Sequence, residues 1–214
     1  MRVVTYNVQS LRASPSGVAD VLRAAEPDIV CLQEAPRFVL ASWRMRRLAA
    51  ACGLVAVGRG RFAGDTAVLV APSVSVRRAR RLRLSRTRGL HRRGALVVRV
   101  EVEGHEVTVV SVHLGLGAAE RVRHARELVT ALAAYKRPFV VAADVNEPPG
   151  GDAWRILSSA IGPAANTRFA TFPAGNPQHV IDTVFVGRPL RVIATGVVRS
   201  TASDHRAVIV DVQA

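Results

Sequence analysis

The stretch VRVEVEGHEVTVVSV, Val98–Val112, carries two alternating apolar runs separated by Glu103 and Gly104. Alternation of this kind is typical of a β-strand with one buried face, and a two-residue break that ends in glycine is typical of a hairpin turn. We therefore predict paired strands over Ala95–Glu103 and Glu106–Leu114. A hairpin in the middle of the chain disfavours a purely parallel, doubly wound sheet.

The same criteria, applied outward from the hairpin, predict seven more strands and three helices. The strands span Val3–Val8, Asp28–Glu34, Thr66–Ala71, Pro138–Asp144, Val180–Val186, Leu190–Val198 and Ala207–Val212, and the helices span residues 16–26, 42–52 and 118–135. We expect His105 to be exposed at the hairpin turn and His124 to lie on the solvated side of the third helix. Because neither a repeat nor a Pro/Gly/Ser linker divides the chain, we predict one α/β domain over residues 1–214.

The composition is strongly basic, with a formal net charge of +14 and 30 basic against 16 acidic residues. The segment Arg77–Arg93 alone holds nine arginines. This surplus fits a polyanionic partner such as nucleic acid, but Lys136 is the only lysine, so a codon bias toward arginine fits equally well. The segment itself either follows phosphates or forms an exposed edge strand and loop whose charges prevent edge-to-edge association.

Several classes of protein are disfavoured by the sequence. No apolar stretch approaches the roughly 18 residues that a membrane-spanning helix needs. The first ten residues resemble a strand rather than a signal peptide, so we expect a cytoplasmic protein, and we expect a monomer. There is no P-loop, no dinucleotide-binding glycine pattern and no nucleophile elbow.

Polar side chains recur at the ends of the predicted strands. These residues comprise four carboxylates, two amides and two imidazoles: Asn7, Glu34, His113, Asp144, Asn146, Asp182, Asp204 and His205. Each alone is an ordinary turn or surface residue, but a twisted sheet would gather them in one crevice. Carboxylates without cysteine favour a hard cation, Mg²⁺ or Mn²⁺, and imidazoles and amides beside it suit a phosphate group.

Six short motifs follow one another in an informative order: TYNVQ, DIVCLQE, VVSVHL, VVAADVNEPP, VIDTVFV and SDHRAV. Together they resemble the endonuclease/exonuclease/phosphatase family over nearly the whole chain, from Val3 to Val210. The resemblance implies a DNase I-like fold, a four-layered α/β sandwich in which two mixed β-sheets pack face to face with helices on the outer faces. It also implies a metal-dependent phosphoesterase site at one end of the sandwich.

The resemblance implies a role for each strand-end residue. Glu34 would be the main metal ligand, Asn7 would support it, and Asp204 would complete the metal shell. His113 would donate a hydrogen bond to the scissile phosphate, and Asn146 would help to stabilise the oxyanion.

Proton transfer falls to the other three residues. Asp144 would position or deprotonate the attacking water, and His205 would act as phosphate ligand and as acid or base. Asp182 rather than the adjacent Asp204 would orient His205, because a carboxylate that accepts from one ring nitrogen fixes the tautomer of the other. Whether Asp144 or His205 takes the proton stays open, and Asp65 is a candidate for bracing His113.

We therefore expect a hydrolase of phosphate esters that depends on Mg²⁺ or Mn²⁺, with water as the nucleophile. A nuclease is the preferred activity because the arginine-rich surface suits a phosphate backbone. The alternative is a phosphatase or a phospholipid phosphodiesterase of the inositol-phosphate or sphingomyelin type, since loops rather than catalytic residues select substrates. A non-catalytic phosphate-binding module is the least favoured reading.

Overall fold

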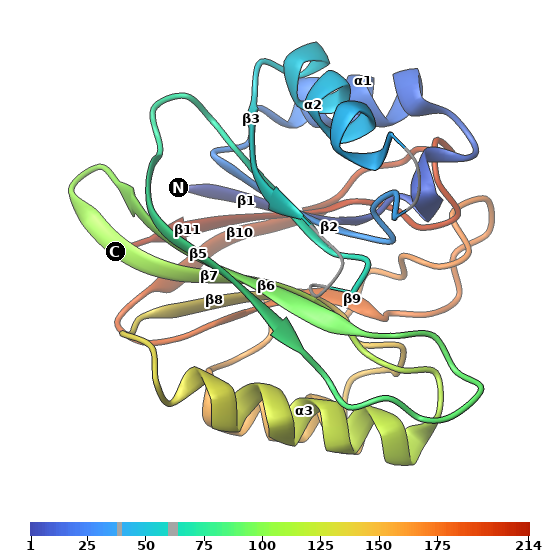
Figure 1. Ribbon diagram of the computed structural model, residues 1–214, viewed down its shortest axis with the longest axis vertical. Helices are drawn as coiled ribbons and strands as arrows, with labels where there is room; N and C mark the ends of the chain where they lie inside the picture. Colours follow the sequence, from blue (N-terminus) through green and yellow to red (C-terminus); the bar gives the residue numbers. More distant parts are fainter. Residues whose placement is uncertain (38–39, 60–63) are drawn as a thin grey trace.

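The computed structural model describes residues 1–37, 40–59 and 64–214 of the chain. Two mixed sheets lie face to face, and helices cover their outer faces (Figure 1). Helices α1 (Pro15–Ala25) and α2 (Ala41–Ala51) pack on the six-stranded sheet, and α3 (Ala118–Leu132) and α4 (Asp152–Ala160) pack on the five-stranded sheet. The expected four-layered sandwich is therefore confirmed.

The six-stranded sheet has the order β10-β11-β1-β2-β4-β3, and the five-stranded sheet has the order β5-β6-β7-β8-β9. Both sheets mix parallel and antiparallel pairs, because β1–β2 and β7–β8 are parallel and the other neighbours are antiparallel. The strands are β1 (Arg2–Asn7), β2 (Ile29–Gln33), β3 (Val55–Arg59), β4 (Ala67–Val70), β5 (Ser75–Arg83), β6 (Gly94–Val102), β7 (His105–His113), β8 (Phe139–Asp144), β9 (Asp182–Val186), β10 (Arg191–Val197) and β11 (Val208–Gln213), and a short 3-10 turn spans Gln9–Leu11.

The predicted hairpin is β6–β7. Its turn residues Glu103 and Gly104 have φ angles of 51° and 80°, so both adopt the left-handed region that a two-residue hairpin turn requires. His105, next to the turn, is exposed as predicted. The pairing continues without a shift from this turn to Ala95 opposite Val112, which brings the start of β6 to the end of β7.

The space between the sheets is filled almost entirely by branched aliphatic side chains. Val3, Ile29 and Val68 from one sheet and Val98 and Val109 from the other are fully buried there. Burial of this apolar surface is the main stabilising contribution in such a layered fold. The edges of the two sheets are therefore held at a fixed spacing, and this spacing positions the polar residues at the strand ends.

Three elements were not predicted as such. β5 has no buried face, so the apolar alternation that marks a strand is absent, and its position at the sheet edge matches the edge-strand alternative for the arginine-rich segment. β3 contains an irregularity in its pairing between Ala56 and Gly58. α4 follows directly after Gly150 and Gly151 and buries only Ala153, Trp154 and Leu157 among its nine residues, which left too short a pattern to detect.

The prediction for His124 was wrong. Its side chain is fully buried, and Nε2 lies 2.8 Å from the backbone oxygen of Ser85. The segment that follows β5 packs on this face of α3, where Glu127 also accepts a hydrogen bond from the Ser85 amide. The helix periodicity could not indicate this burial, because the covering segment is itself polar. In the part of the chain that the structure describes, no helix is long and apolar enough to cross a membrane.

Candidate active site

Three of the predicted residues lie side by side on adjacent strands of the five-stranded sheet. The parallel register of β7 and β8 pairs His113 with Asp144, and the antiparallel register of β8 and β9 pairs Asp144 with Asp182. All three side chains are buried. The strand ends thus bring two carboxylates and an imidazole together, as the sequence pattern indicated.

Asn7 joins this group from the other sheet. It ends β1, and its Nδ2 donates a hydrogen bond to Oδ2 of Asp144 at 2.9 Å. Its Oδ1 accepts a hydrogen bond from the backbone amide of Gln9 at 3.1 Å. Both Asn7 and Asp144 are almost completely buried, and this contact satisfies polar groups that would otherwise be costly to bury. The site therefore lies where the two sheets meet.

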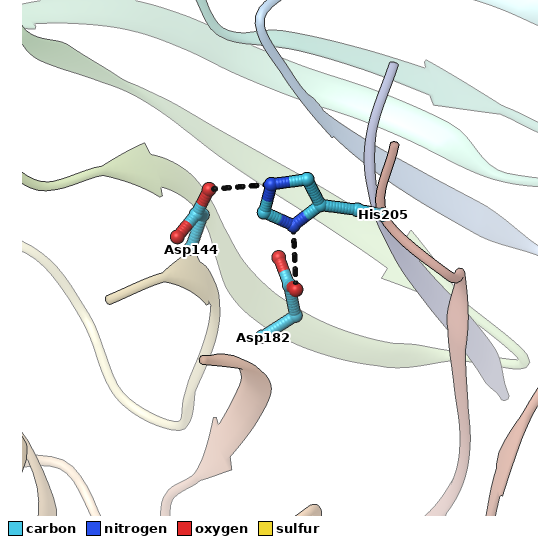
Figure 2. A group of neighbouring side chains, drawn as sticks. All are labelled: Asp144, Asp182 and His205. Carbon is cyan, nitrogen blue, oxygen red and sulfur yellow. Dashed lines mark hydrogen bonds and ion pairs between the residues drawn. The ribbon is translucent and has the colours of Figure 1, made fainter. Parts of the chain in front are cut away.

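His205 reaches the same group from the segment that precedes β11. Its Nδ1 lies 2.8 Å from Oδ2 of Asp182, and its Nε2 lies 4.0 Å from Oδ2 of Asp144 (Figure 2). Thr171 donates a second hydrogen bond to Oδ2 of Asp182 at 2.6 Å, and the Phe172 ring packs at 4.8 Å from the imidazole. Asp182, and not the adjacent Asp204, is thus the partner of His205.

Asp144 is the point on which the other groups converge. Besides the Asn7 amide, the Nε2 atoms of His113 and His205 lie 3.4 Å and 4.0 Å from Oδ2. The backbone amide of Asn146 donates to Oδ1 at 3.1 Å. Asn146 has a φ of 55°, which is tolerated by asparagine in tight turns, and its side-chain amide donates to the Leu114 carbonyl.

The remaining predicted residues, Glu34 and Asp204, stand at the margin of this group. Asp204 accepts hydrogen bonds from Gln9 Nε2 at 3.1 Å and from Ser203 Oγ at 3.2 Å. Glu34 follows β2 directly, with a φ of 49° and a partly exposed side chain. Within residues 1–37, 40–59 and 64–214, no hydrogen bond or ion pair engages the Glu34 carboxylate.

Arg93 is a site residue that the sequence reading missed. Only 7% of it is exposed, and its Nη1 lies 2.6 Å from Oδ2 of Asp65 and 2.8 Å from Nδ1 of His113. Oδ2 of Asp65 lies 3.1 Å from the same ring nitrogen, so Asp65 is in contact with His113. The register of the hairpin could have identified Arg93. Counting residues back from the turn places Arg93, which directly precedes β6, beside His113 at the end of β7.

Burial and charge shift the acidity of the four ionisable groups at the centre. Burial raises the pKa of Asp144 above its ordinary value, and Asp182 adds to this against the opposing charges of His113 and His205. Burial lowers the pKa of His205, but Asp182, Asp144 and Asp204 outweigh it and raise the pKa to about 9.

The pKa of His113 is set by the same opposing effects, with the charge of Arg93 in addition. Burial lowers the pKa of His113, Asp65 and Asp144 raise it, Arg93 opposes them, and the net direction is upward. Burial would raise the pKa of Asp65, but His113 and Arg93 hold it well below its usual range. Asp65 is therefore a permanently charged carboxylate at neutral pH.

The sequence of residues 4–205 matches the model of the Endonuclease/Exonuclease/phosphatase family. The chain belongs to this family. Its members are hydrolytic phosphoesterases, and metal dependence is their general property. The buried Asp144–Asp182–His205 cluster and the two-sheet architecture of this endonuclease/exonuclease/phosphatase member agree with that assignment.

Solved structures share the fold at low sequence identity. An endonuclease/exonuclease/phosphatase from Bacteroides vulgatus has a TM-score of 0.83 at 18% identity, with 99% of this chain and 98% of that chain covered. A mannosyl-6-phosphatase from Bacteroides thetaiotaomicron has a TM-score of 0.82 at 16% identity, with coverage of 100% and 99%. D. rerio TDP2 complexed with single strand DNA product has a TM-score of 0.75 at 15% identity, with coverage of 100% and 99%. Among curated proteins, none matches the chain significantly.

The residues present fit a divalent cation. Asp144, Asp182 and His205 offer three ligand atoms that all lie within 4.8 Å of one another. Oδ1 of Asp182 is buried without a hydrogen-bond partner among the described residues, and an orphaned carboxylate oxygen is a site that a cation would satisfy. This cluster differs from the expected ligands Asn7, Glu34 and Asp204, of which Asn7 touches it through Asp144.

Proposed function

We propose that this protein hydrolyses phosphate esters with the aid of Mg²⁺ or Mn²⁺, and that it is a nuclease. The observation that carries the proposal is the convergence of Asn7 Nδ2, His113 Nε2 and His205 Nε2 on one carboxylate oxygen of Asp144. Hydrogen-bond donors directed at a single point are what a phosphoryl group needs when negative charge develops on its oxygens. The Asp144 carboxylate at the same point is suited to position or deprotonate the attacking water.

We place the metal at the margin of the site and not in the buried Asp144–Asp182–His205 cluster, because three of the four carboxylate oxygens of Asp144 and Asp182 already accept hydrogen bonds. Glu34 is the proposed main ligand because its carboxylate is free of hydrogen bonds and ion pairs within the described residues, with Asn7 and Asp204 in support. When bound, the cation supplies Lewis-acid stabilisation of the phosphoryl oxygens. A hard divalent ion suits carboxylate and amide oxygens better than a soft one, which favours Mg²⁺ or Mn²⁺.

In the proposed reaction a water molecule attacks phosphorus in line with the leaving oxygen. Asp144 or His205 accepts the proton of this water, and Asp182 holds the His205 ring in place through Nδ1. His113 and Asn146 donate hydrogen bonds to the phosphoryl oxygens. The protein then contributes mainly position and electrostatic stabilisation, which dominate the catalysis of phosphoryl transfer.

The choice of a polynucleotide rests on the surface that adjoins the site. All of β5 except Leu82 is exposed, and its last residue, Arg83, pairs with Gly94 directly after Arg93. A row of arginines therefore runs along the edge strand and ends opposite Gly94, the residue that follows Arg93. Arg78 and Arg80 have no ion-pair partner among the described residues, so they are available for phosphates of a nucleic acid.

A panel of substrates tests the catalytic proposal. Wild type, Asp144→Ala and His205→Ala are compared with Mg²⁺ or Mn²⁺ on single-stranded DNA, duplex DNA, RNA, nucleotides, inositol phosphates and sphingomyelin. We expect hydrolysis of a nucleic acid by the wild type and a loss of about 100- to 10,000-fold in both variants. Equal rates in the three proteins would contradict catalysis at this site. Activity on a small ester alone would replace the nuclease with a phosphatase or a phospholipid phosphodiesterase.

The salt dependence of DNA binding tests the surface separately. Replacing Arg78 and Arg80 together by glutamine should lower the slope of log affinity against log salt by up to about 2. Arg191→Gln is the matched control, because this exposed arginine lies on the edge strand β10 of the other sheet, opposite Gln213 at the end remote from the site. An identical slope in all three proteins would remove the role of β5.

A further inference from the structure

Arg93 belongs to an arrangement around His113 that has no counterpart at His205. Its Nη1, Oδ2 of Asp65 and Nδ1 of His113 form a triangle with sides of 2.6, 2.8 and 3.1 Å. All three side chains are buried, with exposed fractions of 6% or less. The ring nitrogen of His113 is therefore in contact with a donor as well as with a carboxylate.

The backbone holds the three groups in place. Gly64, with a φ of 65°, lies so close to the strand start that an added Cβ would be 2.6 Å from the amide nitrogen of Gly94. The turn that carries Asp65 is thus pressed against the chain beside Arg93, where only glycine fits. The carbonyl of Asp65 accepts a hydrogen bond from Ala35, and the carbonyl of Arg93 accepts one from Leu84. This contact is part of the fold and not a chance meeting of long side chains.

The chemistry of the guanidinium decides which way the hydrogen bond runs. Arginine has only donors and does not lose its proton in proteins. When the ring is neutral, Nδ1 at 2.8 Å from Nη1 is placed to accept from the guanidinium, which leaves the ring proton on Nε2. Nε2 is directed toward Asp144, at 3.4 Å from its Oδ2. The Asp65 carboxylate balances the buried charge of Arg93 and does not need the ring proton.

We propose that Arg93 is a positioning residue that fixes the neutral imidazole of His113 in its Nε2–H tautomer, so that His113 faces the substrate as a hydrogen-bond donor. The part of this inference that concerns the substrate rests on the function proposed above, whereas the tautomer does not. The groups that face the ring are Asp65, Arg93 and Asp144. At His205 the partner of Nδ1 is a carboxylate without an arginine, and there the ring donates through Nδ1.

Nitrogen NMR of the histidine rings tests the tautomer directly. Spectra are recorded at alkaline pH, where the imidazole is neutral, and the His113 signals are identified by their absence in His113→Gln. In the wild type we expect an unprotonated Nδ1 and a protonated Nε2. In Arg93→Met we expect the proton to move to Nδ1, where Asp65 then accepts it. Arg92→Met, at an exposed neighbouring arginine, should leave the wild-type pattern unchanged.

The outcomes separate cleanly. A protonated Nδ1 in the wild type overturns the proposal, and so does an unchanged tautomer in Arg93→Met. Should that variant fail to fold, the wild-type spectrum alone still decides the tautomer, because it needs no change at Arg93. We also expect Arg93→Met to lower kcat about 10- to 100-fold with little change in KM. Absence of any phosphoesterase activity in the wild type would instead contradict the proposed function, whatever the tautomer.

Discussion

The site holds two histidine–carboxylate pairs that look alike and differ in one charge. His205 and Asp182 form a hydrogen-bonded pair in which the histidine can gain or lose a proton. His113 and Asp65 are joined by Arg93, a cation that does not titrate in proteins. His205 can therefore change its protonation state during a reaction. His113, in contrast, lies beside the constant charge of Arg93. Under the proposed function, the same pair of residue types serves proton transfer on one side of the site and hydrogen-bond donation on the other.

The largest expected effect tests this division of roles. His205→Gln should lower kcat/KM by about 1,000-fold, because it removes an acid–base group. His113→Gln should lower it by only about 100-fold, because the glutamine amide can still donate a hydrogen bond. Rates on a cleavable phosphodiester measure both, with His105→Gln as the control at the remote, exposed hairpin turn. A greater loss at His113 than at His205 would reverse the comparison.

Stability separates the two carboxylates. Asp65→Asn should lower the free energy of unfolding by about 3 kcal/mol, because Arg93 would be left buried without a counter-charge. Asp182→Asn should lower it by less, about 2 kcal/mol, because the variant loses the interaction that raises the His205 pKa but lets the ring release its proton, so that no uncompensated buried charge remains. Urea denaturation at neutral pH measures both variants. Equal losses would show that the arginine makes no difference between the pairs.

The pH dependence of stability gives the same variant a second test. The pKa of Asp65 is lower in the folded protein than its ordinary value of 3.8, so its stabilising contribution is complete above that value and is lost as the pH falls below it. Asp65→Asn should therefore lose less stability than the wild type on acidification below about pH 4. A parallel decline in both proteins would contradict the assignment of this charge to Asp65.

The smallest expected effect concerns the support of Asp182. Thr171→Val removes the hydroxyl that donates to Oδ2 at 2.6 Å, and should cost about 1.5 kcal/mol of stability and a few-fold in kcat. Thr108→Val is the matched control, because its buried hydroxyl donates to the backbone carbonyl of Lys136, outside the site. It should lose similar stability but no activity. An equal fall in kcat for both would show that Thr171 acts only through the fold.

The sequence predicted the elements with a clear apolar pattern and missed β3, β5 and α4, whose patterns are interrupted, absent and short respectively. All nine predicted strands and all three predicted helices are present, with strand boundaries within two residues. β5 escaped because an edge strand covered with arginines has no alternation, and His124 was misplaced because a polar segment covers it. A sequence pattern therefore shows that a residue is buried only when the side chains that cover it are apolar.

The site residues, likewise, could be predicted only in part. The pairing of His205 with Asp182 could be predicted, because both positions follow from the order of the family motifs and from strand ends. Arg93 could not be distinguished from its eight arginine neighbours by composition. Only the hairpin register identifies it, and that requires the turn to be placed to the residue.

The hydrogen bond between Asn7 and Asp144 has a consequence for how this protein would lose activity. It joins the ends of two sheets whose separation is set by aliphatic side chains far from any reacting group. A cavity at a position such as Val98, between the sheets, would allow one layer to slide against the other while every strand stayed paired. Heating or core truncation should therefore abolish turnover before the circular dichroism of the strands changes, so that the first event in inactivation is slippage between layers and not unfolding.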